Sequence, residues 1–152
     1  MVLTGITRTG DYKASLFLYP ISIPRFNTLL FTITTTSILV ILTILVHLEL
    51  LLTVNRKLVQ SSLKPRLKVI ICVFSALLAH VLEIWLFALG YWLLTLTHSF
   101  GYLTGAFSHG FRDCVYFSIV VYSSVGFGDI LPMGNLRFMA AIEALTELGV
   151  KY

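Results

Sequence analysis

Apolar residues are gathered along the chain in two long runs, residues 28–54 and 67–97, which are separated by a short basic segment. At about 1.5 Å per residue, either run is long enough as a helix to cross a hydrocarbon core of about 30 Å. Residues 1–27 contain glycines, prolines and charged residues with no clear period. We therefore predict two transmembrane helices that follow an irregular N-terminal tail.

A third apolar segment, residues 113–123, is too short to cross a membrane. It begins with Asp113, an acidic residue that suits the N-terminus of a helix. A helix of this length covers only about 18 Å, so the chain must turn back after entering the membrane. Irregular backbone is tolerated at that depth only where protein buries it or where it borders a water-filled cavity. We predict a re-entrant helix within a loop that covers residues 98–134.

The composition agrees with a membrane protein. Of the 152 residues, 57% are hydrophobic and only 12% are charged, and the mean hydropathy is +0.91. A soluble domain of this size could not bury so much apolar surface. The fold class that we predict is an all-α membrane protein, with the lipid bilayer as its surroundings. Cys72 and Cys114 lie in apolar segments, and we interpret them as free thiols.

The basic residues indicate an orientation in the membrane. Residues 55–66 contain no acidic residue, and four of the basic residues lie here. By the positive-inside rule this loop is cytoplasmic, so the N-terminus lies outside. Tyr91 and Trp92, late in the second run, fit an interfacial aromatic belt. We expect a plasma membrane or a bacterial inner membrane. The charge pattern gives no basic patch with interleaved aromatic residues, and we predict no nucleic-acid partner.

Residues 124–129, with the sequence SVGFGD, follow the predicted re-entrant helix. Gly126 and Gly128 permit positive φ angles, and alternating such angles with ordinary ones can point successive carbonyls to one side. A ring of such carbonyls can replace the water shell of a cation. Ser124 can add a hydroxyl at the inner end and Asp129 a carboxylate at the outer mouth. The pattern predicts a filter for cations.

This segment resembles the potassium-channel signature Thr-Val-Gly-Tyr-Gly-Asp, with Ser124 in place of threonine and Phe127 in place of tyrosine. The longer stretch YFSIVVYSSVGFGDILP, residues 116–132, is similar to the pore helix and filter of the two-helix pore module of the ion-channel-2 type. Residues 79–88, AHVLEIWLFA, resemble the outer helix of small prokaryotic members. The resemblance covers about half of the chain.

The resemblance implies a role for individual residues. It implies that backbone carbonyls and the Ser124 hydroxyl form the ion sites, in a selectivity filter made of Ser124, Val125, Gly126, Phe127 and Gly128, with Asp129 at the outer mouth. It implies that the pore helix supports the filter through Asp113, Tyr116, Phe117 and Ser123. It also implies a homotetramer, because one strand cannot surround an ion and cyclic closure makes a ring from identical chains. The permeant species would be monovalent cations, potassium above all, with no cofactor.

Residues 135–152 fit the start of an inner helix, with Asn135 as its cap. Glu143, Glu147 and Lys151 interrupt this segment and share one helical face. In the family this helix continues as a long apolar stretch. We therefore expect an incomplete inner helix, which results from a truncated or frame-disturbed chain or is an unusual short amphipathic end. The alternative function is then a non-conducting channel-like protein, either a fragment or a regulatory subunit.

Two ionisable residues, His80 and Glu83, lie one turn apart within the second apolar run. An interhelical hydrogen bond to a buried partner is our main interpretation, and a proton relay or pH sensor is the alternative. His47 of the first run could complete a metal site with His80 and Glu83, as a metal transporter would need. Counted from the cytoplasmic ends, however, His47 lies about 10 Å deep and His80 about 20 Å deep, so we predict no metal. We find no nucleophile with a base and no phosphate-binding loop, and we expect no enzyme.

Overall fold

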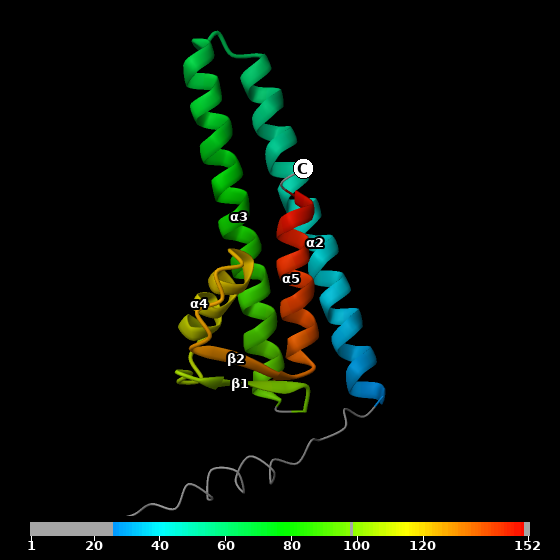
Figure 1. The fold of residues 1–152 in the computed structure, drawn as a ribbon. Coiled ribbons are helices and arrows are strands. Elements are labelled where there is room, and N and C mark those ends of the chain that lie inside the picture. The colour runs from blue at the N-terminus through cyan, green and yellow to red at the C-terminus, as the bar shows by residue number, and fades with distance from the viewer. Residues whose placement is uncertain (1–25, 98, 151–152) are drawn as a thin grey trace, which may run out of the picture.

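The computed structural model describes residues 26–97 and 99–150. These residues form four helices and one two-stranded antiparallel sheet (Figure 1). In chain order the elements are α2 (Phe26–Val59), α3 (Pro65–Leu96), β1 (Gly101–Gly105), α4 (Phe111–Tyr122), β2 (Ile130–Gly134) and α5 (Leu136–Val150). The fold is that of an all-α membrane protein with one small sheet.

Helices α2 and α3 form a long antiparallel hairpin (Figure 1). Each contains an 18-residue window of high mean hydropathy, 2.4 in α2 and 2.3 in α3, and each is long enough to cross a membrane. Only 17% and 11% of these windows are buried inside the chain. A core helix of a soluble protein would hide most of its apolar side chains, whereas lipid can cover the outward faces of α2 and α3.

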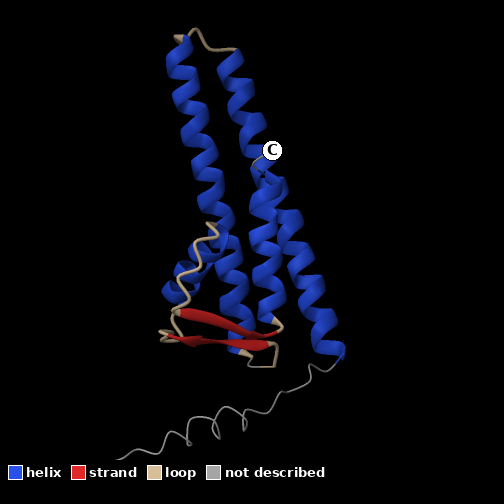
Figure 2. Ribbon diagram, viewed as in Figure 1, coloured by secondary structure: helices blue, strands red, loops and turns tan. Residues whose placement is uncertain are grey.

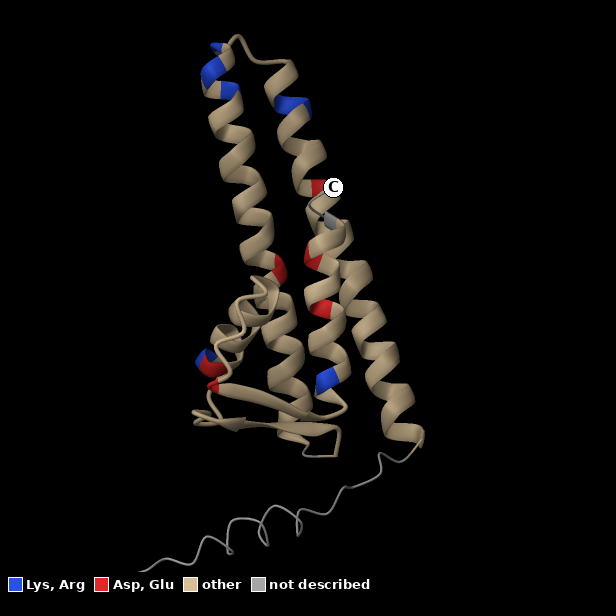
Figure 3. Cartoon of the chain, in the orientation of Figure 1, with Lys and Arg blue, Asp and Glu red and all other residues tan. Residues whose placement is uncertain are grey.

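The turn between α2 and α3 is shorter than the loop predicted over residues 55–66. Helix α2 continues through Arg56 and Lys57, which lie in its last turn, where positive charge is favourable beside the free carbonyls. Helix α3 begins at Pro65, a residue suited to the first helical position. Only residues 60–64 are left between the helices, and Lys and Arg residues gather around this turn (Figure 3). We call it the turn end of the molecule.

At the opposite end, which we call the sheet end, β1 pairs with β2 in a register that runs from Gly101 opposite Gly134 to Gly105 opposite Ile130 (Figure 2). The prediction of an all-α chain missed these strands. Gly134 has a φ of +64° and takes the chain from β2 towards α5. The N-terminal end of α2 also lies at the sheet end.

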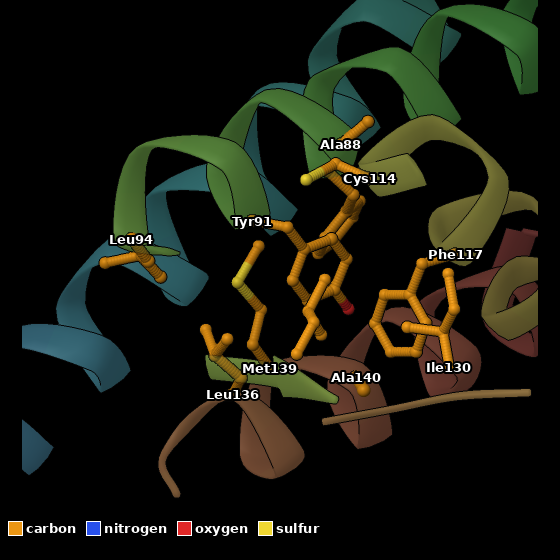
Figure 4. Packing of buried hydrophobic residues seen from close by; sticks show 11 residues of the cluster. Ala88, Tyr91, Leu94, Cys114, Phe117, Ile130, Leu136, Met139 and Ala140 are labelled. Carbon is orange, nitrogen blue, oxygen red and sulfur yellow. The ribbon is translucent and has the colours of Figure 1, made fainter. Parts of the chain in front are cut away.

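The apolar core lies where α3, α4, α5 and the sheet meet (Figure 4). Tyr91 of α3 is fully buried there, and its ring meets that of Phe117 of α4 edge to face, with centroids 4.9 Å apart. We had expected Tyr91 in an interfacial aromatic belt, and this prediction was wrong. The side chain lies in the core instead, where its hydroxyl has a buried partner. Trp92 is partly buried against the same core and contacts Phe111.

The first 25 residues of the predicted N-terminal tail lie outside the described residues. The last two residues of that tail, Phe26 and Asn27, belong to α2. Lys151, which we expected on the same face as Glu143 and Glu147, also lies outside them. Both glutamates are buried rather than exposed on an amphipathic face.

Candidate functional site

Helix α4 starts near the sheet end and points towards the middle of α3, where the chain turns back to the sheet (Figure 1). It has 12 residues, which agrees with a helix too short to span a bilayer. Ser118 fixes it between its neighbours, since its hydroxyl donates to Glu143 on α5 and lies 3.0 Å from the carbonyl oxygen of Ile84 on α3. The segment between α4 and β2 contains the predicted filter.

The predicted filter has an alternating backbone. Ser124, Gly126 and Gly128 have φ angles of 56°, 59° and 78°, while Val125 and Phe127 between them keep ordinary negative angles. This alternation is the one that can turn successive carbonyls to one side. The positive φ angles at Gly126 and Gly128 agree with the prediction from the glycine spacing. The positive angle at Ser124 was not foreseen, because a non-glycine residue is strained there.

Hydrogen bonds hold the two ends of this segment. At one end the Ser124 N–H donates to the carbonyl of Val121 at 3.0 Å, and at the other end the Ala106 N–H donates to the carbonyl of Asp129 at 2.9 Å. The Tyr116 hydroxyl also donates to the Asp129 carboxylate at 2.8 Å. This bond raises the pKa of Tyr116.

Between these ends the segment has little contact with its own chain. Residues 123–129 are all exposed, including the apolar side chains of Val125 (56%) and Phe127 (69%). A Cβ added at Gly126 or Gly128 would meet no described atom within 4 Å. Apolar exposure of this kind indicates a surface that another molecule covers.

The other residues assigned to filter support lie in different surroundings. Asp113 accepts hydrogen bonds from the hydroxyl and N–H of Ser108, both at 2.6 Å. Both bonds lower the pKa of Asp113, and the bond from the Ser108 hydroxyl has the larger effect. Phe117 packs in the core against Tyr91. The Ser123 hydroxyl donates to the carbonyl of Ile119 at 2.7 Å and so ends α4.

Glu143 on α5 connects three helices. Its Oε2 accepts a hydrogen bond from the Tyr91 hydroxyl at 2.6 Å, and its Oε1 accepts one from Ser118. The side chain is fully buried. In the sequence Glu143 stands out only as an interruption of the predicted inner helix, because no local spacing relates it to Tyr91.

A second polar group, which we call the histidine cluster, consists of His47, His80, Glu83 and Tyr122. His47 Nδ1 lies 2.6 Å from Glu83 Oε1, and His80 Nδ1 lies 3.5 Å from Glu83 Oε2. The Tyr122 hydroxyl donates to Glu83 and lies 2.8 Å from His80 Nδ1. Glu83 is 1% exposed, so its carboxyl group lies inside the hairpin of α2 and α3 with three polar partners.

The prediction that His47 lies too far from His80 was wrong. The two imidazole rings have centroids 5.3 Å apart. The depth estimate failed because both helices continue into the segment that we took for a loop. Counted from Val59 and Pro65, the ends that face the turn, the two histidines are about 18 and 22 Å deep.

A short helix that packs against α3 and α5 and is followed by a segment of alternating backbone is typical of membrane proteins of the pore-loop class. The family model described as Ion channel matches residues 69–150, which is more than half of the chain. The chain therefore belongs to this ion channel family. The match includes most of α3, the sheet, α4, residues 124–129 and α5, whereas all of α2 precedes it. Searches of curated proteins and of solved structures gave no match.

Proposed function

We propose that this chain is a subunit of a potassium-favouring cation channel and that ions pass along the backbone carbonyls of residues 124–127. The observation that carries the proposal is the alternation of φ at Ser124, Gly126 and Gly128 in the segment that follows the short helix α4. Carbonyls presented at close spacing replace the hydration shell of a potassium ion. The Ser124 hydroxyl adds a ligand at the inner end.

The exposure of Val125 and Phe127 supports a homotetramer. Both side chains lie beside the proposed ion path without cover from their own chain. Four copies around a central axis would complete the carbonyl rings and cover these two side chains, and cyclic symmetry allows identical chains to do so. The basic turn end then faces the cytoplasm and the sheet end faces outward.

Cation flux into liposomes that contain the purified chain tests the proposal, with potassium compared with sodium. Gly126→Ala and Gly110→Ala form a matched pair. A Cβ has room at both positions, but Gly126 has a φ of 59° and Gly110 a φ of −88°. Only the first substitution strains the backbone.

We expect potassium flux to exceed sodium flux in the wild type and in Gly110→Ala, and to fall at least tenfold in Gly126→Ala. Native mass spectrometry in detergent should give a four-chain species. A wild-type chain that inserts correctly and passes no ion would contradict conduction, and would favour a non-conducting channel-like protein. Equal potassium and sodium flux would contradict selectivity alone.

A further inference from the structure

The histidine cluster places two imidazole groups and one carboxylate around a common point inside the hairpin of α2 and α3. One ligand atom from each of His47, His80 and Glu83 lies within 4.8 Å of the other two. His47 and Glu83 are buried, and His80 is partly exposed. We propose that these three side chains form a binding site for a divalent transition metal ion of the zinc class.

The donor set favours this class of ion. Two imidazole nitrogens and one carboxylate oxygen form a set that holds Zn²⁺ in proteins, with a fourth position left for water or another ligand. Magnesium and calcium prefer oxygen donors, so the two imidazoles disfavour them. The ion that fits this site is therefore zinc or another divalent transition metal that accepts imidazole ligands.

The distances are close to those that a tetrahedral ion requires. Zinc lies about 2.0–2.1 Å from each ligand, which places the ligand atoms about 3.3 Å apart. The distance of 3.5 Å between His80 Nδ1 and Glu83 Oε2 is near this value. The distance of 2.6 Å between His47 Nδ1 and Glu83 Oε1 is shorter. Because the ligand atoms lie within 4.8 Å of one another, side-chain rotations that separate His47 from Glu83 would be needed to seat the ion.

The charge of the site also favours a cation. Glu83 lies within an apolar spanning helix, and its described partners are two imidazoles and the Tyr122 phenol. An ionised carboxylate at this depth requires compensation. Two more buried carboxyl groups on α5, Glu143 and Glu147, interact electrostatically with Tyr122 and so lie near the cluster. A divalent ion bound to Glu83 would compensate the charge of this carboxylate.

A pocket between α2 and α5 gives the cluster an open side. It has a volume of about 410 Å³ and is lined mainly by apolar side chains of α2, and His47 is the member of the cluster that lies in its wall. On the other side of the cluster, Tyr122 donates a hydrogen bond to Glu83 and can orient the carboxylate as a second partner.

The test is a Co²⁺ titration of the full chain, purified in detergent without an affinity tag and followed by visible absorption. Cobalt replaces zinc in tetrahedral sites and gives an intense band there. We expect one ion per chain and displacement of the band by Zn²⁺. The double variant His47→Gln and His80→Gln should lose the band, and its binding should weaken at least 100-fold. His109→Gln and Cys72→Ser, which change exposed residues outside the cluster, should leave binding unchanged.

Absence of cobalt uptake by the wild type, or equal uptake by the double variant, would overturn the proposal. If the double variant does not fold by circular dichroism, X-ray absorption of zinc-loaded wild type decides the matter. Two imidazole ligands support the site, and fewer than two overturn it. These measurements involve no ion flux, so their result is independent of whether the chain conducts.

Discussion

The hydroxyl of Tyr91 on α3 donates a hydrogen bond of 2.6 Å to the carboxyl group of Glu143 on α5. The second oxygen of the same carboxyl group accepts from Ser118 on α4. One buried side chain thus holds the pore-loop helix and its two neighbours together. Removal of one such partner lowers the free energy of unfolding, because the remaining polar group stays buried with no other hydrogen-bond partner in its place.

Tyr91→Phe should therefore destabilise the fold. The substitution keeps the ring that packs on Phe117 and removes only the hydroxyl, so Glu143 loses one of its two described hydrogen-bond donors. We expect a loss of about 1–3 kcal/mol, measured by thermal unfolding in detergent. Tyr116→Phe is the matched control, since the hydroxyl of Tyr116 lies on an exposed residue. An equal melting temperature for the two variants would contradict the structural role of Glu143.

Glycine substitutions at two adjacent serines should have opposite effects on stability. Ser124 has a φ of 56°, which a serine tolerates poorly, whereas Ser123 has a φ of −74°. Ser124→Gly should relieve about 1 kcal/mol of strain. Ser123→Gly should cost about 0.5–1 kcal/mol, because it adds flexibility where none is needed and removes the bond to Ile119. Unfolding of both variants at lower temperature than wild type would exclude strain at Ser124.

The start of α4 should lose stability in acid. Ser108 lowers the pKa of Asp113 in the folded chain. A group with a depressed folded pKa stabilises the fold fully above its unfolded pKa of about 3.9, and this contribution is lost as the pH falls through the folded value. We expect the melting temperature of the wild type to fall more steeply below about pH 4 than that of Asp113→Asn. Parallel curves for the two proteins would show that this carboxylate contributes nothing.

Gly105→Ala should disrupt the sheet beside the predicted filter. Gly105 has a φ of +98°, and an added Cβ would lie 2.1 Å from the carbonyl oxygen of Asp129. Since neither backbone segment can yield without breaking a ladder hydrogen bond, we expect a loss of about 1–3 kcal/mol. Gly110→Ala serves again as control because a Cβ has room there. The measurement is thermal unfolding, and an unchanged Gly105→Ala melting temperature would contradict the close contact.

The apolar runs and the glycine spacing were sufficient to predict two helices long and apolar enough to cross a membrane, the short helix α4 and the position of the alternating backbone. Those features depend on local composition and on residues close together in the chain. The strands were missed because GYLTG and ILPMG are short, contain glycine and proline, and show no alternation of apolar and polar positions.

The polar pairs were missed for a different reason. Tyr91 and Glu143, like His47 and Glu83, are far apart in the sequence and meet only through the packing of helices. Their meeting depends on where each helix ends, and helix ends are the least certain part of a sequence pattern. An error of a few residues at the turn of α2 and α3 was enough to separate His47 from His80 in the depth estimate.

The pairing of β1 with β2 joins the residues that follow α3 to those that follow residues 124–129. Because Gly105 and Ala106 contact the backbone of Asp129, a displacement of this outer loop is transmitted directly to the end of the ion path that we propose. An antibody or a peptide that binds β1 would thus displace the backbone of Asp129. It could change conduction from the protein surface without any part of it entering the pore.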